Sequence, residues 1–134
     1  MYNILIVDDE KKEREGIALL LKRFGFPLRT AFAQNGEDAL KIMEKNHFDI
    51  LLTDIKMPYM DGLELARNLK QDNPDVRILI LTGFDEFEYA KEAVHLEIEE
   101  YILKPVNAKE LSDCLKRLKD VLDKEREEKL NIRK

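Results

Sequence analysis

The sequence predicts a single α/β domain built around a parallel β-sheet. Short apolar runs alternate along the chain with longer segments of helical period, which is typical of βαβ units. The chain has 134 residues, of which 44% are hydrophobic, so it is long enough for one compact domain and too apolar for a disordered chain. Several apolar runs are nearly continuous, as expected for strands that are covered on both faces.

Five strands are expected, and the composition of each run supports it. The runs at residues 2–7, 50–53, 76–81 and 101–103 are apolar almost throughout, which favours strands buried on both faces. The run at 28–33 alternates between polar and apolar residues, which favours a strand at the edge of the sheet.

Five helices are expected to connect these strands, at residues 11–24, 36–46, 62–71, 86–96 and 108–128. Pro or Gly interrupts the pattern at 25–27, 57–62, 72–75 and 104–105. Two helix starts have the spacing of a capping box, Asp85 with Glu88 and Asn107 with Glu110.

The last helix carries four leucines in a 4-3-4 spacing, Leu111, Leu115, Leu118 and Leu122. The next two heptad positions are Glu125 and Lys129, so the row favours a helix face packed on the sheet over a continuing coiled coil. Residues 109–134 hold 9 Lys/Arg and 7 Asp/Glu, against 14 and 21 in residues 1–108. We therefore expect a domain at 1–122, followed at 123–134 by a polar helix extension or the start of a linker.

The composition also excludes several classes of function. The formal net charge of -5 argues against a general nucleic-acid surface, which needs clustered Lys and Arg. Cys114 is the single cysteine, which excludes an internal disulfide or a CxxC site and predicts a half-buried thiol in a reducing compartment. No apolar run approaches the roughly 18 residues of a membrane span, and residues 1–10 turn acidic too early for a signal peptide. We expect a cytoplasmic protein without membrane contact.

Residues at the carboxyl ends of the strands predict the site, because ligands of an open parallel sheet bind at this edge. The residues there are Asp8, Asp9, Asp54, Thr82 and Lys104. Three neighbouring carboxylates repel one another unless a cation lies between them, and oxygen ligands without nearby Cys or His favour Mg²⁺. Mg²⁺ keeps waters and phosphate oxygens in its shell, which indicates phosphoryl chemistry. Lys104 and Thr82 would then contact phosphoryl oxygens, and Asp54 would accept the group as an acyl phosphate.

Taken singly, these residues have ordinary explanations. An Asp pair such as Asp8 and Asp9 often ends a strand and caps the next helix, and Thr82 alone suits a strand. Lys104 alone would be a solvated lysine at a turn. It is their conjunction at neighbouring strand ends that favours a site.

Other candidates are assigned structural roles. Asp61 and Gly62 are expected to form a turn that leads into a helix. His47 and His95 have no partner at metal-ligand spacing and are expected at the surface, and the methionines are expected to pack in the core: Met43, Met57 and Met60.

Over residues 2 to about 120, the chain resembles the response-regulator receiver domains of bacterial two-component signalling. The resemblance rests on motifs in a fixed order, namely Asp8-Asp9-Glu10, Asp54 followed by Met57-Pro58 and Asp61-Gly62, Leu81-Thr82-Gly83, and Lys104-Pro105. It implies the flavodoxin-like receiver fold, a single five-stranded parallel sheet of order 2-1-3-4-5 flanked by five helices.

The same resemblance implies a role for each site residue. Asp54 corresponds to the phosphoacceptor. Asp9 and Asp54 would bind Mg²⁺ directly together with the main-chain carbonyl of Lys56, and Asp8 would help mainly through water. Thr82 and Tyr101 correspond to the family's switch pair, and Lys104 to its phosphate-binding lysine, which is usually followed by a cis peptide at Pro105.

The implied function is a phosphorylation-activated switch, not an enzyme, that receives its phosphoryl group from a sensor histidine kinase. Phosphorylation is expected to change the surface of the fourth helix, fifth strand and fifth helix, near Phe87, Ala90 and Ala93, and to promote a homodimer. Residues 14–17 and 83–90 are similar to receivers joined to AraC-type DNA-binding domains. DNA would then be reached only through an effector domain outside this chain, and the output would be transcription regulation.

Three alternatives are weaker. A phosphatase or phosphotransferase of the haloacid dehalogenase type resembles a DxD pattern, whose second acid donates a proton, and this chain has Lys56 there. A flavodoxin-like cofactor binder needs a phosphate loop in place of the acidic turn at 8–10. A receiver-like module that no longer accepts phosphate would lack residues that are present here.

Signal lifetime can also be predicted from two positions. Lys56 and Phe84 lie two residues after Asp54 and Thr82, beside the path of an attacking water. A long cation and a bulky ring orient water poorly, so we expect slow self-dephosphorylation.

Overall fold

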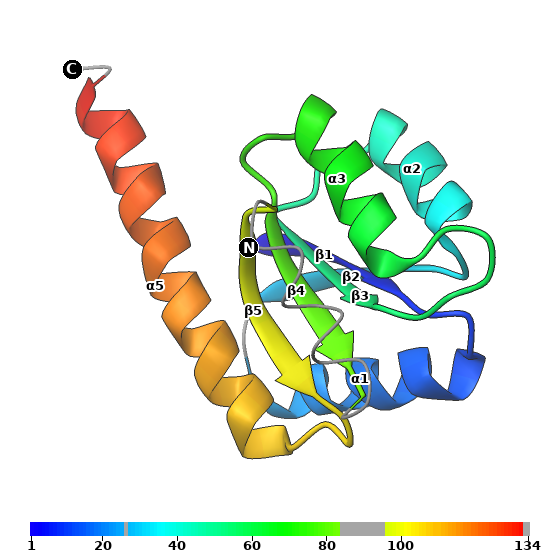
Figure 1. The fold of residues 1–134 in the computed structure, drawn as a ribbon. Coiled ribbons are helices and arrows are strands. Elements are labelled where there is room, and N and C mark those ends of the chain that lie inside the picture. Colours follow the sequence, from blue (N-terminus) through cyan, green and yellow to red (C-terminus); the bar gives the residue numbers. More distant parts are fainter. Residues whose placement is uncertain (26, 84–95, 133–134) are drawn as a thin grey trace.

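The five strands form one parallel sheet in the order β2-β1-β3-β4-β5. The computed structural model describes residues 1–25, 27–83 and 96–132. The strands are β1 (Tyr2–Val7), β2 (Leu28–Ala33), β3 (Ile50–Asp54), β4 (Arg77–Thr82) and β5 (Ile98–Leu103). The helices in the described part of the chain are α1 (Lys11–Arg23), α2 (Gly36–Lys45), α3 (Gly62–Asp72) and α5 (Ala108–Ile132) (Figure 1).

The predicted fold class, strand order and parallel pairing are confirmed. The helix expected at 86–96 lies, except for its last residue, on 84–95, outside the described residues, as do Asp85, Glu88 and His95. The other four helices agree with the predicted ranges to within a few residues.

The sheet is covered by helices on both faces, with α2 and α3 on one side and α1 and α5 on the other (Figure 1). Each face has its own apolar core, and the side chains of β1, β3 and β4 alternate between the two cores. The largest fully buried side chains include Ile4, Leu5, Leu51 and Leu79. Each such burial contributes roughly 1.5–3 kcal/mol, which explains why these runs are continuously apolar.

The two edge strands are the more polar ones. β2 is an edge strand, as its alternating pattern predicts. β5 lies at the opposite edge and starts at Ile98, three residues before the predicted strand. A register irregularity in its pairing with β4 places Glu100 beside Leu79 and leaves Glu99 out of the ladder. An edge strand can place such charges toward solvent. The prediction from apolar runs therefore missed residues 98–100, which include Glu99 and Glu100.

Polar side chains cap three helices. The main-chain N–H of Glu110 donates to Asn107 Oδ1 at 3.0 Å, which confirms the helix start at Asn107. Asp61 caps α3 in the same way, because its Oδ1 accepts from the Glu64 N–H at 2.8 Å. Asn35 Oδ1 accepts from the Asp38 N–H at 2.7 Å at the start of α2. Each cap satisfies an N–H group that the helix itself leaves unpaired.

Helix α5 packs on the sheet through the predicted leucine row, since Leu111, Leu115, Leu118 and Leu122 are all buried in one core. The prediction for Cys114 was wrong, because the thiol is fully buried in the same core. Burial raises the pKa of Cys114 to about 12, so the thiol stays protonated and unreactive. The helix continues to Ile132, beyond the predicted end near 128.

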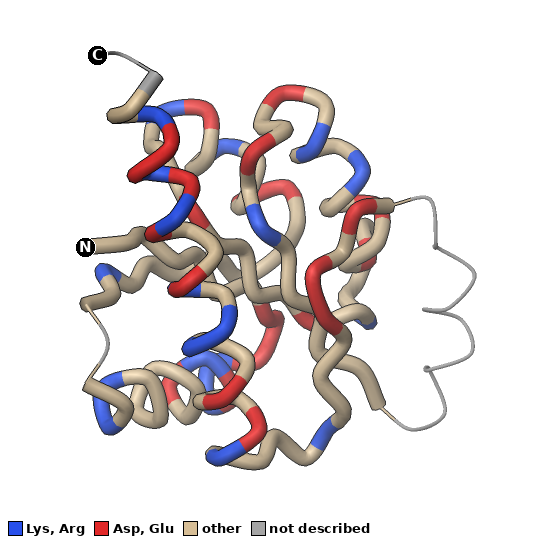
Figure 2. The backbone as a smooth tube through the Cα atoms, turned by 90° about the vertical axis from the view of Figure 1, so that its left-hand side faces the viewer, with Lys and Arg blue, Asp and Glu red and all other residues tan. Residues whose placement is uncertain are grey.

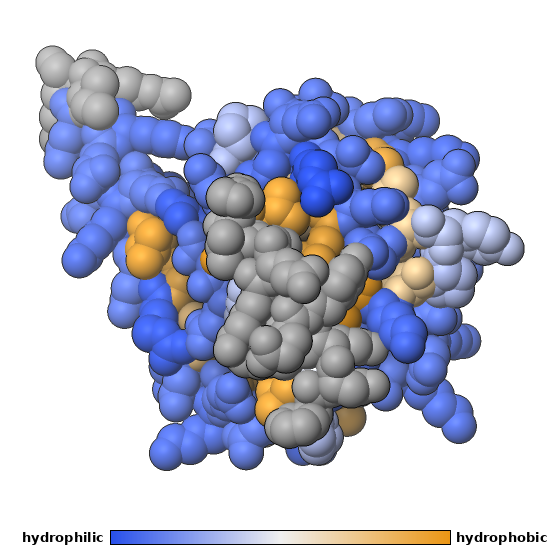
Figure 3. Space-filling model, in the orientation of Figure 1, coloured by the Kyte–Doolittle hydropathy of each residue, from blue (hydrophilic) through white to orange (hydrophobic). Residues whose placement is uncertain are grey.

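The surface is mostly polar. Figure 3 shows a largely hydrophilic face with small hydrophobic areas beside α5 and the sheet. None of the helices in the described ranges combines the length and the apolar character of a transmembrane span. His47 is exposed, and the methionines Met43 and Met57 are buried, as predicted.

Candidate functional site

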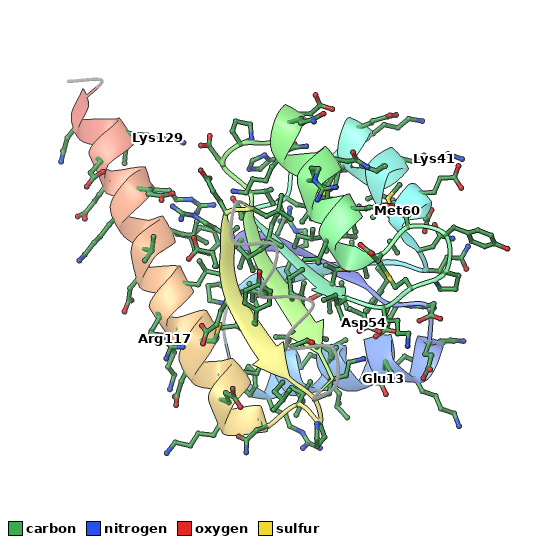
Figure 4. The ribbon with its side chains drawn as sticks, in the orientation of Figure 1. Glu13, Lys41, Asp54, Met60, Arg117 and Lys129 are labelled. Carbon is green, nitrogen blue, oxygen red and sulfur yellow. The ribbon has the colours of Figure 1, made fainter. Side chains whose placement is uncertain are left out.

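Four neighbouring strands bring the predicted site residues to one edge of the sheet. β1 ends just before Asp8, β3 ends at Asp54, β4 ends at Thr82, and Lys104 follows β5. Because these strands are parallel neighbours, their carboxyl ends meet. Figure 4 shows Asp54 at this edge, where the loops after the strands meet α1.

Three carboxylates form a compact group of oxygen donors. One carboxylate oxygen each of Asp8, Asp9 and Asp54 lies within 4.8 Å of the others. Asp8 and Asp54 are buried, whereas Asp9 is exposed, so the group lines a pocket that is open on one side. This arrangement concentrates negative charge where solvent screens it poorly.

Asp8 shows the effect of this charge. Burial, opposed by a hydrogen bond from the Glu10 N–H and reinforced by the charge of Asp54, raises the pKa of Asp8 to about 6. Its Oδ1 accepts the Glu10 N–H at 2.9 Å. Its Oδ2 is buried and finds no hydrogen-bond partner among the described residues. An unpartnered buried oxygen beside two further carboxylates suits a small divalent cation.

The donor set fits Mg²⁺ in its chemistry. Mg²⁺ prefers hard oxygen ligands, and it is commonly held by one or two carboxylates together with water and phosphate oxygens. The group contains oxygens only, with no Cys or His in it, which disfavours zinc. The buried oxygen of Asp8 is the observation in this structure that such an ion would satisfy.

Lys104 supplies a positive charge to the same pocket. Its Nζ lies 3.0 Å from Asp54 Oδ1. Burial lowers the pKa of Lys104, but the hydrogen bond and charge of Asp54 outweigh this, so the pKa is raised above its ordinary value. The ammonium is therefore charged at neutral pH. The peptide bond from Lys104 to Pro105 is cis, as the sequence resemblance predicts.

Thr82 and Tyr101 lie on adjacent strands close to the pocket. Thr82 is fully buried, and its Oγ1 donates to the main-chain oxygen of Gly83 at 3.1 Å. Tyr101 pairs in register with Ile80, two residues before Thr82, and is partly buried against the core under α2 and α3. Burial raises the pKa of Tyr101. Thr82 and Tyr101 are thus diagonal neighbours in the β4–β5 pairing.

The ordinary explanation of Asp8 and Asp9, that they cap the following helix, does not hold for α1. The N-cap residue of α1 is Glu10, whose side chain makes no capping bond within the described structure. Asp8 instead receives the Glu10 N–H two residues ahead, in a turn that keeps its second oxygen in the pocket. Lys56 follows β3 with an exposed side chain, and Phe84 lies outside the described residues.

Two residues support the site although they were not assigned to it from the sequence. The Arg14 Nη1 donates to the main-chain oxygen of Asp8 at 2.6 Å and so fixes the strand end. Gly62 packs against the end of β3, where a Cβ atom would lie 2.3 Å from the Asp54 carbonyl oxygen. In the sequence, Asp61 and Gly62 indicate only a turn. The contact of Gly62 with Asp54 could not be recognised there, because no local pattern shows how closely the two backbones approach.

Comparison with known proteins agrees with this geometry. The model of the family described as "Response regulator receiver domain" matches residues 4–116. The uncharacterized transcriptional regulatory protein YesN of Bacillus subtilis is 39% identical over 120 residues, which are 88% of this chain and 32% of YesN. The chain spans about a third to a half of the length of the curated relatives it matches.

Solved structures give the same result. The two component transcriptional regulator AraC from Clostridium phytofermentans is 36% identical, with a TM-score of 0.81 over 92% of this chain and 97% of that one. TrrA from Thermotoga maritima, solved in complex with Mg²⁺ and BeF, is 33% identical, with a TM-score of 0.77 over 88% and 99%. Fold, pocket and sequence therefore lead to one conclusion, that this chain belongs to the response regulator receiver domain family of two-component signalling.

Proposed function

We propose that this receiver domain is a switch that is turned on when Asp54 accepts a phosphoryl group from a sensor histidine kinase. The observation that carries the proposal is the pairing of a buried carboxylate with a charged amine, Asp54 Oδ1 with Lys104 Nζ at 3.0 Å, beside the carboxylates of Asp8 and Asp9. A carboxylate so placed can attack phosphorus while positive charge remains beside it.

The proposed transfer forms an acyl phosphate. An oxygen of Asp54 attacks the phosphorus of the donor, the bond from phosphorus to the donor's imidazole nitrogen breaks, and that nitrogen keeps the electron pair. The product carries roughly two negative charges where Asp54 carried one. The Lys104 ammonium is positioned to neutralise part of this added charge, and Thr82 is a hydroxyl donor close to the same strand ends.

Asp8, Asp9 and Asp54 would hold Mg²⁺, together with the main-chain carbonyl of Lys56. When bound, the ion supplies positive charge that offsets the repulsion among the carboxylates and the phosphoryl oxygens. The support is the oxygen-only donor set and the unpartnered Oδ2 of Asp8. The role of the Lys56 carbonyl rests on the sequence resemblance.

A groove beside the pocket offers the phosphodonor a place to dock. It measures about 570 Å³ and is lined by the α1 residues Gly16, Ile17 and Leu20 and by the Lys104–Val106 segment. The groove is largely apolar, with Lys12, Glu13 and Lys104 at its margins. A helix of the kinase that laid apolar residues here would bring its phosphohistidine next to Asp54.

The proposed response to phosphorylation runs through Thr82 and Tyr101. A hydroxyl that moves toward the new phosphoryl oxygens leaves space into which a neighbouring aromatic ring can turn. Tyr101 is the aromatic residue in reach along β5. The resulting change would affect the face formed by β5 and α5 and promote a homodimer, and the residues Phe87, Ala90 and Ala93 expected on that face lie outside the described residues.

The proposed output is regulation of transcription through an effector domain outside this chain, in line with the transcriptional regulatory proteins among its relatives. The chain itself has a net charge of -5, which argues against a general DNA-binding surface. Slow self-dephosphorylation is part of the proposal. It predicts that Lys56→Asn or Phe84→Glu speeds the loss of label, and loss within seconds in the unmodified protein, without acceleration by either change, would contradict it.

Intact-mass spectrometry tests phosphorylation directly. After incubation with acetyl phosphate and Mg²⁺, the chain should gain about 80 Da, the mass of one phosphoryl group. The Asp54→Ala variant should show no gain under the same conditions. A chain that gains no mass with any small phosphodonor, or gains it equally in Asp54→Ala, would rule the proposal out.

A further inference from the structure

Helix α5 contacts the edge of the sheet opposite to Asp54 through residues 123–126 and then continues as a helix, exposed at residues 127–131, to Ile132 (Figure 1). This edge is formed by the amino ends of the strands, with Tyr2 at the start of β1, Asp49 just before β3 and Arg77 at the start of β4. The segment 123–132 is so polar that its sequence suggests a frayed end or a linker. The structure nevertheless keeps it helical, and Figure 2 shows acidic and basic residues interspersed along it.

The first contact joins α5 to β1. The Tyr2 hydroxyl donates to Asp123 Oδ1, and the other carboxylate oxygen of Asp123 accepts from Lys119 Nζ at 2.8 Å. The Tyr2 ring is only 3% exposed and packs in the same core as Leu122. Asp123 therefore meets a buried phenol whose position is fixed by the core.

The second contact lies one turn further along α5. The Arg126 guanidinium carbon is 3.8 Å from the centroid of the Tyr2 ring, which is the geometry of a cation–π interaction. Its Nη2 donates to the main-chain oxygen of Met1 at 3.2 Å and lies 3.9 Å from Asp49 Oδ1. Asp49 is itself held by the Asn3 N–H, which donates to its Oδ2 at 2.8 Å.

The third contact connects α5 to both β4 and β5. Arg77, at the start of β4, forms an ion pair with Glu125 of α5 and a second one with Glu99 of β5. Arg117 of α5 pairs with Glu100 of β5 through both carboxylate oxygens at 2.9 Å. The strand that carries Tyr101 is thus bound to α5 directly at Glu100, and indirectly at Glu99 through Arg77 of β4.

These contacts differ from the pairs usual on an exposed helix. An i,i+4 pair such as Lys119 with Asp123 lies within one helix and says nothing about where the helix docks. Tyr2, Asp49 and Arg77 are far from residues 123–126 in the sequence and are held by the sheet. Three residues of the extension, at positions 123, 125 and 126 within about one helical turn, contact such fixed partners.

We propose that Tyr2, Asp49 and Arg77, with Asp123, Glu125 and Arg126, form a polar clamp that makes residues 123–132 a rigid lever of the domain. Whatever chain or partner is attached at the far end of α5 is then held in a fixed direction relative to the sheet. Because Arg77 of the clamp also pairs with Glu99 of β5, the clamp is linked through Arg77 to the strand that carries Tyr101. The docking itself does not depend on phosphorylation of Asp54, so the two proposals fail separately.

Amide hydrogen exchange in the unphosphorylated chain measures how strongly the clamp protects the end of α5. Arg126→Ala removes the guanidinium, and Tyr2→Phe removes the hydroxyl while keeping the buried ring. In each variant the amides of 124–130 should exchange at least about tenfold faster, whereas those of 111–118 keep their protection. Lys129→Ala is the matched control, because Lys129 is an exposed cation on the same part of α5 (Figure 4).

A distance measurement gives the second test. Spin labels at the exposed positions Glu44 and Asn131, each changed to Cys, report the direction of the lever, and the buried Cys114 is not labelled. The unmodified clamp should give a narrow distance distribution that broadens in Arg126→Ala and stays narrow in Lys129→Ala. A broad distribution in all three proteins, or exchange of 124–130 that neither Arg126→Ala nor Tyr2→Phe accelerates, would overturn the proposal.

Discussion

A Cβ atom on Gly62 would lie 2.3 Å from the main-chain carbonyl oxygen of Asp54. No real side-chain carbon approaches a carbonyl oxygen so closely, so the start of α3 can pack under the end of β3 only without a side chain here. The Gly62 N–H also donates to the Ile55 oxygen at 2.8 Å, which fixes the loop between β3 and α3. The turn after Asp54 is therefore part of the acidic site.

Gly62→Ala should destabilise the fold by about 1–3 kcal/mol, because the added methyl group forces the backbone at Asp54 to move. Urea unfolding measures this change. Gly16→Ala is the matched control, since a Cβ atom on Gly16 in α1 meets nothing within 4 Å. That variant should gain up to about 1 kcal/mol from helix propensity. Equal stability of Gly62→Ala and the unmodified chain would contradict the packing described here.

Lys104→Gln should slow phosphorylation of Asp54 by about tenfold or more, because it removes the positive charge 3.0 Å from the attacking carboxylate. The rate of mass gain from acetyl phosphate measures the effect. Lys109→Gln changes an exposed lysine of α5 and should leave the rate unchanged. An undiminished rate in Lys104→Gln would show that the ammonium does not act on the reacting group.

The pKa of Asp8 gives a pH dependence with a definite sign. Because the pKa is raised from 3.8 to about 6, the folded chain binds a proton more tightly than the unfolded chain does. The corresponding stability is present below about pH 4 and is lost as the pH rises through 6. A shift of this size corresponds to about 3 kcal/mol in the free energy of unfolding. The actual loss should be smaller, because solvent at the open side of the acidic group screens the charge.

Asp8→Asn should therefore raise the melting temperature at pH 7 without Mg²⁺ and change it little at pH 4. Addition of Mg²⁺ at pH 7 should stabilise the unmodified chain, because the ion offsets the same repulsion, and should stabilise Asp8→Asn much less. Thermal melts followed by circular dichroism at both pH values measure this. A melting temperature of the unmodified chain that does not respond to Mg²⁺ would contradict the assignment of the acidic group.

Thr82→Ala should break the link between the pocket and the dimer surface. Size-exclusion chromatography with beryllofluoride, a mimic of the phosphoryl group, should show a dimer for the unmodified chain and a monomer for Thr82→Ala. Thr30→Ala is the control, because Thr30 is a partly buried threonine of another strand, β2. This variant should dimerise normally. Dimerisation of Thr82→Ala to the same extent would remove Thr82 from the switch.

The sequence was sufficient for the sheet and for the residues at its carboxyl edge, because both follow from local patterns. Continuous apolar runs such as 50–53 mark buried strands, and parallel pairing then brings Asp8, Asp54 and Lys104 together. β5 was predicted too short because its edge position permits Glu99 and Glu100, which no apolar pattern can show.

Contacts between distant segments could not be predicted in this way. The contact of Gly62 with Asp54 depends on how α3 enters against β3. The contacts of α5 with Tyr2 and Arg77 join segments that lie far apart in the sequence, so no local pattern of the polar residues 123–132 could show them. The burial of Cys114 depends on the angle of α5 to the sheet, and a charged helix leaves that angle open.

The proposed phosphorylation of Asp54 is tested most directly by identifying the phosphorylated residue. Borohydride reduces an aspartyl phosphate to homoserine, which lowers the mass of that residue by about 14 Da and survives digestion. After acetyl phosphate and Mg²⁺, peptide mapping should find homoserine at position 54, with Asp8 and Asp9 unchanged. Homoserine at position 8 or 9, or none at position 54, would contradict phosphorylation of Asp54.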